Sequence, residues 1–303
     1  MLLLAVGVGI REWCAWNWQF YWPVIITYWT FIWFDRHTPH TGGTDRYQWV
    51  LDLPLWSWYA DYFQTQLVRT TPLNPHGNYI FGYHPHGIYV FGTPIFVTNE
   101  CNFKELFPNI KLRIGTLDVN FKVPIWREMQ LAMKLISVSA DSIKNVLSKG
   151  PGWSVMIVIG GAQEAMLSYP GTADLVLKRR KGFVRVGIQT GAALVPVFTF
   201  GENDLYYQTT PERNPKIASL QSWFQKATGF SFPFGMGKFG WIPLRRKIVS
   251  VVGAPIHVIK QDNPSQEYID ELHAKYIQSL AKLYDTYKDT YAPNRIRDMR
   301  IVG

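Results

Sequence analysis

The chain has 303 residues, enough for one large domain with a substantial core. It contains only two cysteines, which excludes a disulfide framework and indicates a reducing, cytosol-facing environment. The net charge of +9 admits nucleic acid, an anionic membrane or a polyanionic small molecule as partner. Because the basic residues are scattered and the aromatic residues gather near the N-terminus, we predict no nucleic-acid partner.

An apolar leader opens the chain, and we predict a membrane anchor over residues 1–35 followed by one domain over residues 36–303. Residues 13–33 carry no formal charge, and as a helix they would be about 31 Å long, close to the hydrocarbon thickness of a bilayer. Their six tryptophans are typical of the membrane interface. These features favour a hairpin or an oblique anchor, with a single span as the alternative and a soluble core helix as the third interpretation.

Residues 38–43 form a polar linker, and residues 49–68 then show apolar side chains at mixed spacing. This second stretch predicts a helix on the surface of the domain. Its aromatic residues, among them Trp56 and Trp58, would either pack on the core or extend the membrane contact.

Residues 78–94 contain the first chemical motif, an apolar run that ends in His-Pro-His-Gly. The run predicts a buried strand that stops at His84 and His86. A turn with Pro85 and Gly87 holds the imidazoles rigidly, and a fixed histidine with an ordinary pKa of about 6.5 suits a general base. The alternatives are histidines that only bond backbone carbonyls, or half of a metal site. No further ligands lie at zinc-site spacing, so we predict no metal.

Two predicted helices follow, over residues 124–136 and 141–149, the second capped by Ser139 or Asp141. Residues 153–159 are almost continuously apolar, as in a strand buried on both faces of an α/β sheet. The strand runs into Gly160, Gly161 and Glu164. The two glycines would let a substrate approach closely, and Glu164 would either act in the site or serve as a structural carboxylate.

A run of cations lies around the start of a helix predicted from Gly182 to Gly191. Helix N-termini attract anions, so the run predicts phosphate contacts, with a solvated charged surface as the alternative. A second basic group, residues 245–247, would bind either phosphates or membrane headgroups. The cations of the first run are Lys178, Arg179, Arg180, Lys181 and Arg185.

Residues 193–200 predict a third strand, which ends in Glu202, Asn203 and Asp204. Residues 205–245 predict a long functional loop with one helix near 219–227, and residues 247–253 a last strand. A helix that starts at residues 263–266, with proline at its first position, continues as a long amphipathic helix over the sheet. Three strands thus deliver polar side chains from their ends.

These motifs resemble the type-2 diacylglycerol acyltransferase family, which includes monoacylglycerol and wax-alcohol acyltransferases. The sequence departs from the family pattern at residues 61–64, which are Asp-Tyr-Phe-Gln in place of Asp-Tyr-Phe-Pro. It also lacks the aspartate that the wider glycerolipid acyltransferases carry five residues after a histidine, since Tyr89 and Phe91 stand there. The matching segments are Tyr79–Gly87, Pro124–Glu128, Ile157–Glu164, Arg180–Val184 and Gly191–Asp204.

The resemblance implies an α/β fold with a glycerolipid-acyltransferase-like mixed sheet flanked by helices. It implies an enzyme of the endoplasmic reticulum membrane with a cytosol-facing catalytic domain, also found at lipid droplets. Such an enzyme moves a fatty acyl group from acyl-CoA to a lipid hydroxyl, here most directly from acyl-CoA to diacylglycerol to form triacylglycerol. The family's catalytic histidines fall on His84 and His86, and its glutamate motif falls on Glu164.

We hypothesise that His86 deprotonates the acceptor hydroxyl, oriented by His84 or Glu164, with His84 as the alternative base. Acyl-CoA is the co-substrate and no other cofactor is required. Diacylglycerol, monoacylglycerol or another lipid alcohol, a bilayer and a second copy of the chain complete the expected partners. The competing class is a non-catalytic lipid-binding protein, which leaves the two histidines unexplained. The expected substrate contacts are Gly87, Gly160 and Gly161 for the oxyanion, the five cations of residues 178–185 for phosphates, and Glu202 and Asn203.

Overall fold

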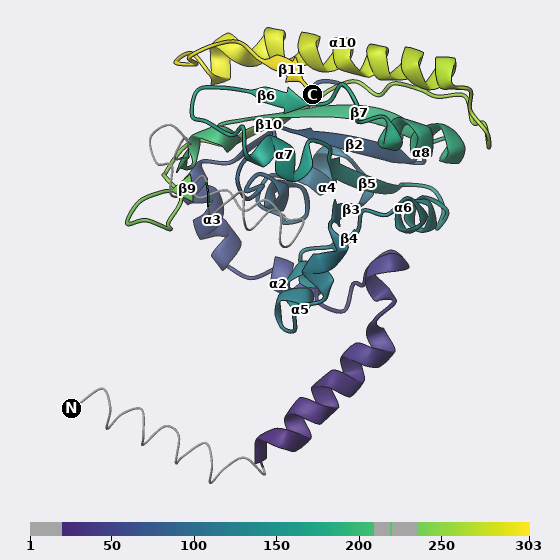
Figure 1. Ribbon diagram of the computed structural model, residues 1–303, viewed down its shortest axis with the longest axis vertical. Helices are drawn as coiled ribbons and strands as arrows, with labels where there is room; N and C mark the ends of the chain where they lie inside the picture. The colour runs from purple at the N-terminus through teal and green to yellow at the C-terminus, as the bar shows by residue number, and fades with distance from the viewer. Residues whose placement is uncertain (1–19, 209–218, 220–234) are drawn as a thin grey trace.

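The computed structural model describes residues 20–208, Ser219 and residues 235–303, and a seven-stranded mixed sheet lies at its centre (Figure 1). Strands β7, β2, β5, β3 and β4 are mutually parallel, whereas β10 runs antiparallel to β7 and carries β1 parallel to itself at the edge. The sheet order is β1 (Gln66–Arg69), β10 (Val249–Val252), β7 (Ala193–Phe200), β2 (Tyr79–His84), β5 (Trp153–Val158), β3 (Lys111–Thr116) and β4 (Leu135–Ser137).

Helices cover both faces of this sheet, and two small sheets lie beside it. The small sheets pair β6 (Asp174–Val176) with β11 (Arg300–Val302), and β8 (Tyr207–Gln208) with β9 (Gly235–Met236). The helices are α2 (Gln48–Leu51), α3 (Leu55–Phe63), α4 (Phe103–Leu106), α5 (Trp126–Ala132), α6 (Ala140–Leu147), α7 (Gly161–Ala165), α8 (Gly182–Thr190) and α10 (Gln266–Tyr291), with 3-10 turns η1 (Thr38–His40), η2 (Thr93–Phe96), η3 (Asp118–Phe121) and η4 (Glu202–Asp204).

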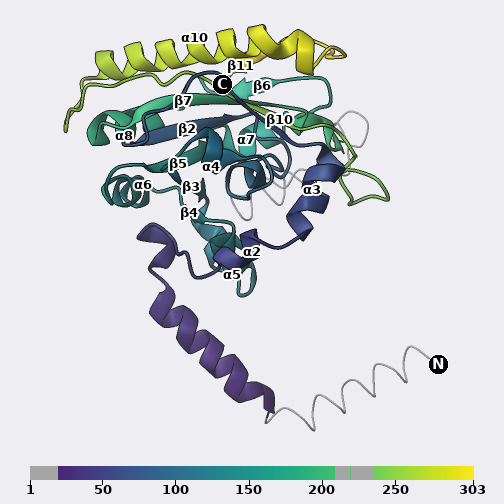
Figure 2. The same cartoon turned by 180° about the vertical axis from the view of Figure 1, so that it is seen from behind.

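Strand β2 lies between β7 and β5, and all six of its residues are buried. Its side chains pack alternately on the two faces of the sheet. Ile80 belongs to the apolar cluster that α6, α8 and α10 build on one face, and Phe81 belongs to the aromatic cluster on the other. The long helix α10 lies across the first face, as Figures 1 and 2 show from opposite sides. Gly82 faces α10, and a side chain there would overlap the Tyr276 hydroxyl, so only glycine allows this close approach.

The predicted strands at 78–83, 153–159, 193–200 and 247–253 are confirmed, as are the helix capped by Ser139, the helix after Gly182 and the long C-terminal helix. The C-terminal helix is capped by the Ser265 side chain, which accepts a hydrogen bond from the Tyr268 N–H. The helix predicted near 219–227 lies largely outside the described residues.

Two helices are shorter in the structure than the sequence predicted. The stretch 49–68 breaks into α2 and α3 at Pro54, and α3 ends at Gln64, whose φ is +46°, so that residues 66–69 can pair with β10. The helix predicted over 124–136 ends with α5, and Ile136 lies in β4. In both places sheet pairing outweighs the local helical spacing, because pairing buries the strand and satisfies its backbone groups.

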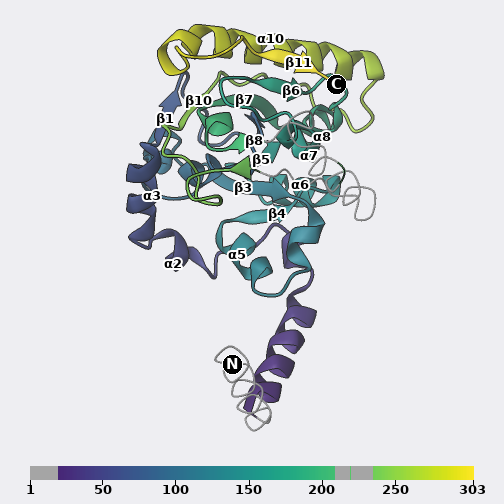
Figure 3. The ribbon, with the colours of Figure 1, turned by 60° about the vertical axis from the view of Figure 1, so that its left-hand side comes forward.

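A helix that includes residues 20–35 projects away from the body of the protein (Figures 1 and 3). Its base is fixed by ion pairs from Asp35 to Arg127 and Arg46, and its middle by a hydrogen bond from Tyr28 to Glu128. Within residues 20–208 and 235–303, no helix has the length and apolar character required to cross a bilayer. The leader before Phe20, where most of the predicted anchor falls, lies outside the described residues.

Candidate active site

Strands β7, β2 and β5 are parallel neighbours, so their carboxyl ends meet at one edge of the sheet. His84 ends β2, Glu164 lies in the short helix after β5, and Glu202 opens the turn after β7. The structure therefore brings together the side chains that the sequence predicted from three separate strands.

His86 lies in the turn after β2 and is partly buried. Its Nδ1 lies 2.9 Å from the Gly87 carbonyl oxygen. A carbonyl oxygen only accepts hydrogen bonds, so Nδ1 carries the proton and Nε2 keeps its lone pair. Burial lowers the pKa of His86, so the ring is neutral at pH 7.

His84 is fully buried, and its ring is held by α10. Its Nε2 lies 3.1 Å from the Tyr276 hydroxyl, which donates its own proton to the Gly82 carbonyl at 3.1 Å. The Nε2 of His84 is therefore the donor, and its Nδ1 is a buried acceptor with no protein partner in the described residues. Burial lowers the pKa of His84 to about 3, so this ring too is neutral.

Glu164 is 1% exposed and accepts two backbone hydrogen bonds. The His86 N–H donates to one oxygen at 2.6 Å and the Val176 N–H of β6 donates to the other at 2.8 Å. The carboxylate thus holds the backbone of the histidine turn and contacts no imidazole nitrogen through a described hydrogen bond. Burial raises its pKa to about 7, against the opposing effect of these two N–H donors.

Glu202 holds the other end of the same turn. It is 2% exposed and accepts hydrogen bonds from the Tyr83 hydroxyl at 2.5 Å, the Phe91 N–H at 2.6 Å and the Gly92 N–H at 2.8 Å. Burial raises its pKa to about 7. Gly87 has φ +63° and a side chain there would lie 2.7 Å from Glu202 Cγ, so the turn requires glycine at this position.

Asn203 and Asp204, which follow Glu202, form hydrogen bonds with other residues of the protein. Asn203 accepts from the Ser168 hydroxyl at 2.7 Å and donates to the Thr172 carbonyl at 2.8 Å, while Asp204 accepts from the Gly171 N–H at 2.7 Å. These bonds tie the turn after β7 to the segment that leads into β6. The substrate contacts expected of Glu202 and Asn203 stay a prediction.

Four cations of the run lie in the loop between β6 and α8, and the fifth, Arg185, lies in the first turn of α8. Arg180 donates to the Gln163 side chain at 2.9 Å, Lys181 forms a 2.7 Å ion pair with Asp270, and Arg185 reaches Gln266 at 3.4 Å. Lys178 and Arg179 are exposed. The structure thus places Arg180 next to α7, which carries Glu164, and directs Lys181 and Arg185 toward α10. Lys178 and Arg179 are open to solvent.

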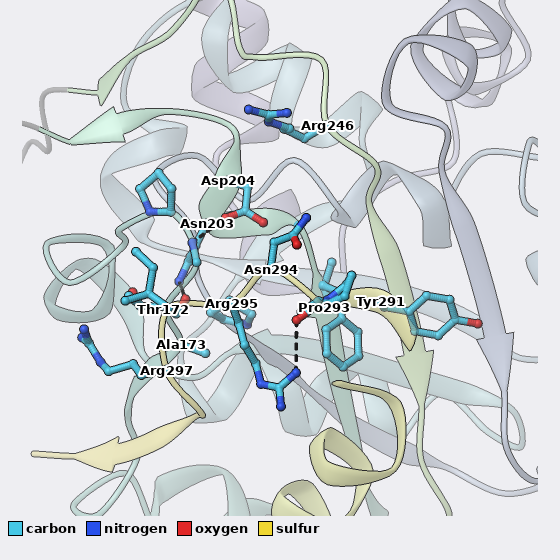
Figure 4. A pocket seen from close by; sticks show the side chains of 18 of the residues that line it. Thr172, Ala173, Asn203, Asp204, Arg246, Tyr291, Pro293, Asn294, Arg295 and Arg297 are labelled. Atoms are coloured by element: carbon cyan, nitrogen blue, oxygen red, sulfur yellow. Dashed lines mark hydrogen bonds between the residues drawn. The ribbon is translucent and has the colours of Figure 1, made fainter. Parts of the chain in front are cut away.

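A cavity of about 400 Å³ opens next to Pro85, on the side of the sheet that faces α10 (Figure 4). Aromatic rings from β7 and α10 form part of its wall, and the segment after α10 forms another part. Arg246 from the second basic group lies at this cavity. The sequence did not predict this feature, because the segment 291–297 contains no motif that indicates its return to the sheet.

Gly160 and Gly161 lie at the start of α7, and a side chain at Gly160 would overlap Glu164. Tyr83 and Tyr276, which hold Glu202 and His84, were also missed, because each is one aromatic residue in an apolar run. No group of three histidine, cysteine or acid side chains within the described ranges could hold a metal ion.

Comparisons with known proteins agree with one another. The sequence profile described as "Diacylglycerol acyltransferase" matches residues 16–301. Diacylglycerol O-acyltransferase 2B of Umbelopsis ramanniana is 42% identical over 93% of this chain and 83% of its own length. The 2-acylglycerol O-acyltransferase 1 of Bos taurus (89% of this chain, 83% of the relative) and the human acyl-CoA wax alcohol acyltransferase 1 (89% and 84%) are each 40% identical.

Among solved structures, the 1-acyl-sn-glycerophosphate acyltransferase PlsC of Thermotoga maritima covers 90% of this chain and 97% of its own, at 12% identity and a TM-score of 0.41. The sequence comparisons define the protein as an acyltransferase of lipid metabolism. It belongs to the diacylglycerol acyltransferase family.

Proposed function

We propose that the protein transfers a fatty acyl group from acyl-CoA to the free hydroxyl of diacylglycerol, with monoacylglycerol or a long-chain alcohol as the second choice of acceptor. The description of the matching profile, "Diacylglycerol acyltransferase", supports the first choice, and relatives named for the other two classes stand at similar identity and supply the second. The test is an assay of the purified protein with labelled acyl-CoA against diacylglycerol, monoacylglycerol, a long-chain alcohol and a lysophospholipid. Faster turnover of any acceptor other than diacylglycerol would contradict the first choice.

The observation that carries the mechanism is the hydrogen bond from His86 Nδ1 to the Gly87 carbonyl, which leaves Nε2 free to take a proton. Nε2 removes the proton of the acceptor hydroxyl while the oxygen attacks the thioester carbonyl. The carbon–sulfur bond of the resulting tetrahedral intermediate then breaks. The thiolate of coenzyme A leaves and takes the proton from His86, which restores the neutral ring.

Glu164 and His84 act as positioning residues in this proposal. Glu164 fixes the backbone N–H of His86, so it sets where the ring stands without touching it. His84 is fixed by its hydrogen bond to Tyr276. Its buried Nδ1 carries a lone pair and lies in the chain two residues before His86. The oxyanion would be met by backbone N–H groups near Gly87 or at Gly160 and Gly161.

We expect the acid limb of the pH–rate profile to have its midpoint below about 6.5, the ordinary pKa of histidine. The base must be neutral to act, and burial lowers the pKa of His86, so the neutral form persists to lower pH. Measuring kcat/KM from pH 5 to 8 checks this. A midpoint near 7 would instead assign control to the ionisation of Glu164 or Glu202, because burial raises the pKa of each to about 7.

Replacing Arg179 and Arg180 together by glutamate is expected to raise the KM for acyl-CoA roughly tenfold, and that for diacylglycerol much less. Charge reversal in the loop beside Glu164 would repel the phosphates of coenzyme A. Lys275→Glu, on the exposed surface of α10, is the matched control. An equal rise in KM for both substrates would contradict the phosphate-binding role of Arg179 and Arg180. If Arg246→Glu selectively raised the KM for acyl-CoA, the phosphates would instead be assigned to the cavity next to Pro85.

We also propose that residues 1–35 anchor the domain of residues 36–303 to the endoplasmic reticulum membrane or a lipid droplet. Support comes from the apolar leader and from the family's association with membranes. The full chain should resist extraction from membranes by alkaline carbonate, because its attachment is hydrophobic. Release of the full chain by carbonate would contradict the anchor.

A further inference from the structure

The turn that follows β9 presents two aromatic side chains to solvent. Phe239 is 81% exposed and Trp241 is 79% exposed, the two largest values among the exposed large hydrophobic residues of the described ranges. We call residues 237–242 the aromatic turn. Exposed apolar side chains that occur together mark an interaction site more often than single ones do.

The backbone of the aromatic turn is built to hold these side chains outward. The Lys238 N–H donates to the Ile242 carbonyl at 2.6 Å, and the Ile242 N–H donates back at 3.1 Å. Phe239 has φ +53°, a conformation that is unfavourable for a residue with a side chain. The Tyr206 hydroxyl donates to the Trp241 carbonyl at 3.2 Å and fixes the turn to the body. The backbone is therefore strained at Phe239, the residue whose aromatic ring is the most exposed in the described ranges.

The aromatic turn is joined to the histidine turn through a short chain of contacts. Gly235 of β9 packs so closely on Ile88 and Tyr206 that a side chain at this glycine would lie 2.8 Å and 2.9 Å from them. Ile88 is two residues after His86. The Tyr206 ring lies 5.4 Å from that of Tyr89, in an edge-on contact. The aromatic turn and the proposed base are therefore parts of one packed unit.

The aromatic turn also continues an apolar flank of the protein. The Tyr62 hydroxyl of α3 donates to the Pro243 carbonyl at 2.7 Å, which joins α3 to the chain just after the turn. Trp58 of α3 and Trp49 of α2 are 75% and 62% exposed. Figure 1 shows that β9, α3 and α2 follow one another along this flank toward the base of the projecting helix.

Cations accompany the aromatic residues. Lys238 is exposed, with its Nζ 5.5 Å from the centre of the Phe239 ring, and Arg245 is exposed three residues after the turn. Aromatic side chains with adjacent cations suit the boundary between headgroups and acyl chains of an anionic lipid surface. A soluble protein partner would require a complementary apolar surface, and the continuity of the flank with the projecting helix favours lipid.

We infer that the aromatic turn is a second membrane contact, which seats Phe239 and Trp241 in an anionic lipid surface and sets the histidine turn beside the acceptor lipid. The inference rests on the proposed function only in requiring that the acceptor is a membrane lipid. Insertion of the turn does not depend on catalysis. The two experiments below therefore separate failure of the membrane contact from failure of the acyl-transfer reaction.

The first experiment measures depth in the membrane. The full chain with Cys14→Ser and Cys101→Ser receives one cysteine, Phe239→Cys, which is labelled with a nitrobenzoxadiazole fluorophore. Ile259→Cys, at an apolar position that is 71% exposed outside this flank, is the matched control. In nanodiscs of phosphatidylcholine and phosphatidylserine, doxyl lipids should quench the label at 239 at least roughly threefold more than at 259. Equal quenching at both positions would overturn the inference.

The second experiment compares acceptors. The double variant Phe239→Ser and Trp241→Ser should transfer to long-chain diacylglycerol in nanodiscs about tenfold more slowly than the unaltered chain, with a short-chain diacylglycerol in free solution affected less than twofold. Ile259→Ser should change neither rate. An unchanged rate in nanodiscs, or an equal loss with both acceptors, would contradict a membrane role for the turn. Absence of transfer by the unaltered chain would instead count against the proposed function.

Discussion

Replacing His86 by alanine is expected to lower the rate of acyl transfer by roughly 10²–10⁴-fold, the range that a general base contributes. The variant loses the imidazole but keeps the backbone N–H of residue 86, which donates a hydrogen bond to Glu164. The hydrogen bond that holds the turn therefore remains. Transfer of labelled acyl groups to diacylglycerol by the purified protein in nanodiscs measures the loss. Circular dichroism and the melting temperature establish that the variant is folded.

The matched control is His257→Ala, which removes an exposed histidine away from the site. The variant His84→Ala separates the two candidates for the base. If His84→Ala abolishes transfer and His86→Ala retains it, the base is His84. If both single variants retain transfer, neither imidazole is the base and the mechanism proposed above is wrong.

Replacing Glu202 by alanine is expected to lower the free energy of unfolding by about 3–9 kcal/mol, since each of three donors left unpaired costs about 1–3 kcal/mol. Three donors lose their acceptor at once: the Tyr83 hydroxyl and the N–H groups of Phe91 and Gly92. The loss is a large part of the stability of an ordinary domain, about 5–15 kcal/mol. Chemical denaturation of the detergent-solubilised chain measures it.

Two further variants test the cause of that loss. Glu202→Gln keeps one acceptor oxygen and should be destabilised less than Glu202→Ala. Tyr83→Phe removes one of the three donors, so its effect and that of Glu202→Ala should be less than additive in the double variant. Additive effects would show that the Tyr83–Glu202 hydrogen bond is not part of the cost.

The positions of β2, β5, β7 and β10 could be predicted from the sequence because each is short, apolar and ended by glycine, proline or polar residues, whereas β3 (Lys111–Thr116) was missed. The parallel arrangement then follows, since strands that alternate with helices pair in parallel. The helix boundaries near residues 64 and 132 could not be predicted, because Gln64 and Lys134 adopt positive φ to let the chain enter the sheet. No local sequence pattern indicates that the residues after Gln64 and Lys134 will pair with strands that are distant in the sequence or in the sheet.

The amino-acid sequence by itself determined the membership of an acyltransferase family and the candidate site residues: the paired histidines, the glutamate after the second strand and the cationic run. Local spacing and residue type carry that information. Only the tertiary structure decided which imidazole nitrogen is free, that Glu164 holds the backbone of His86, and that Tyr276 from α10 fixes His84. The last two of these contacts join residues 78 and 192 positions apart, and burial in one core selects them.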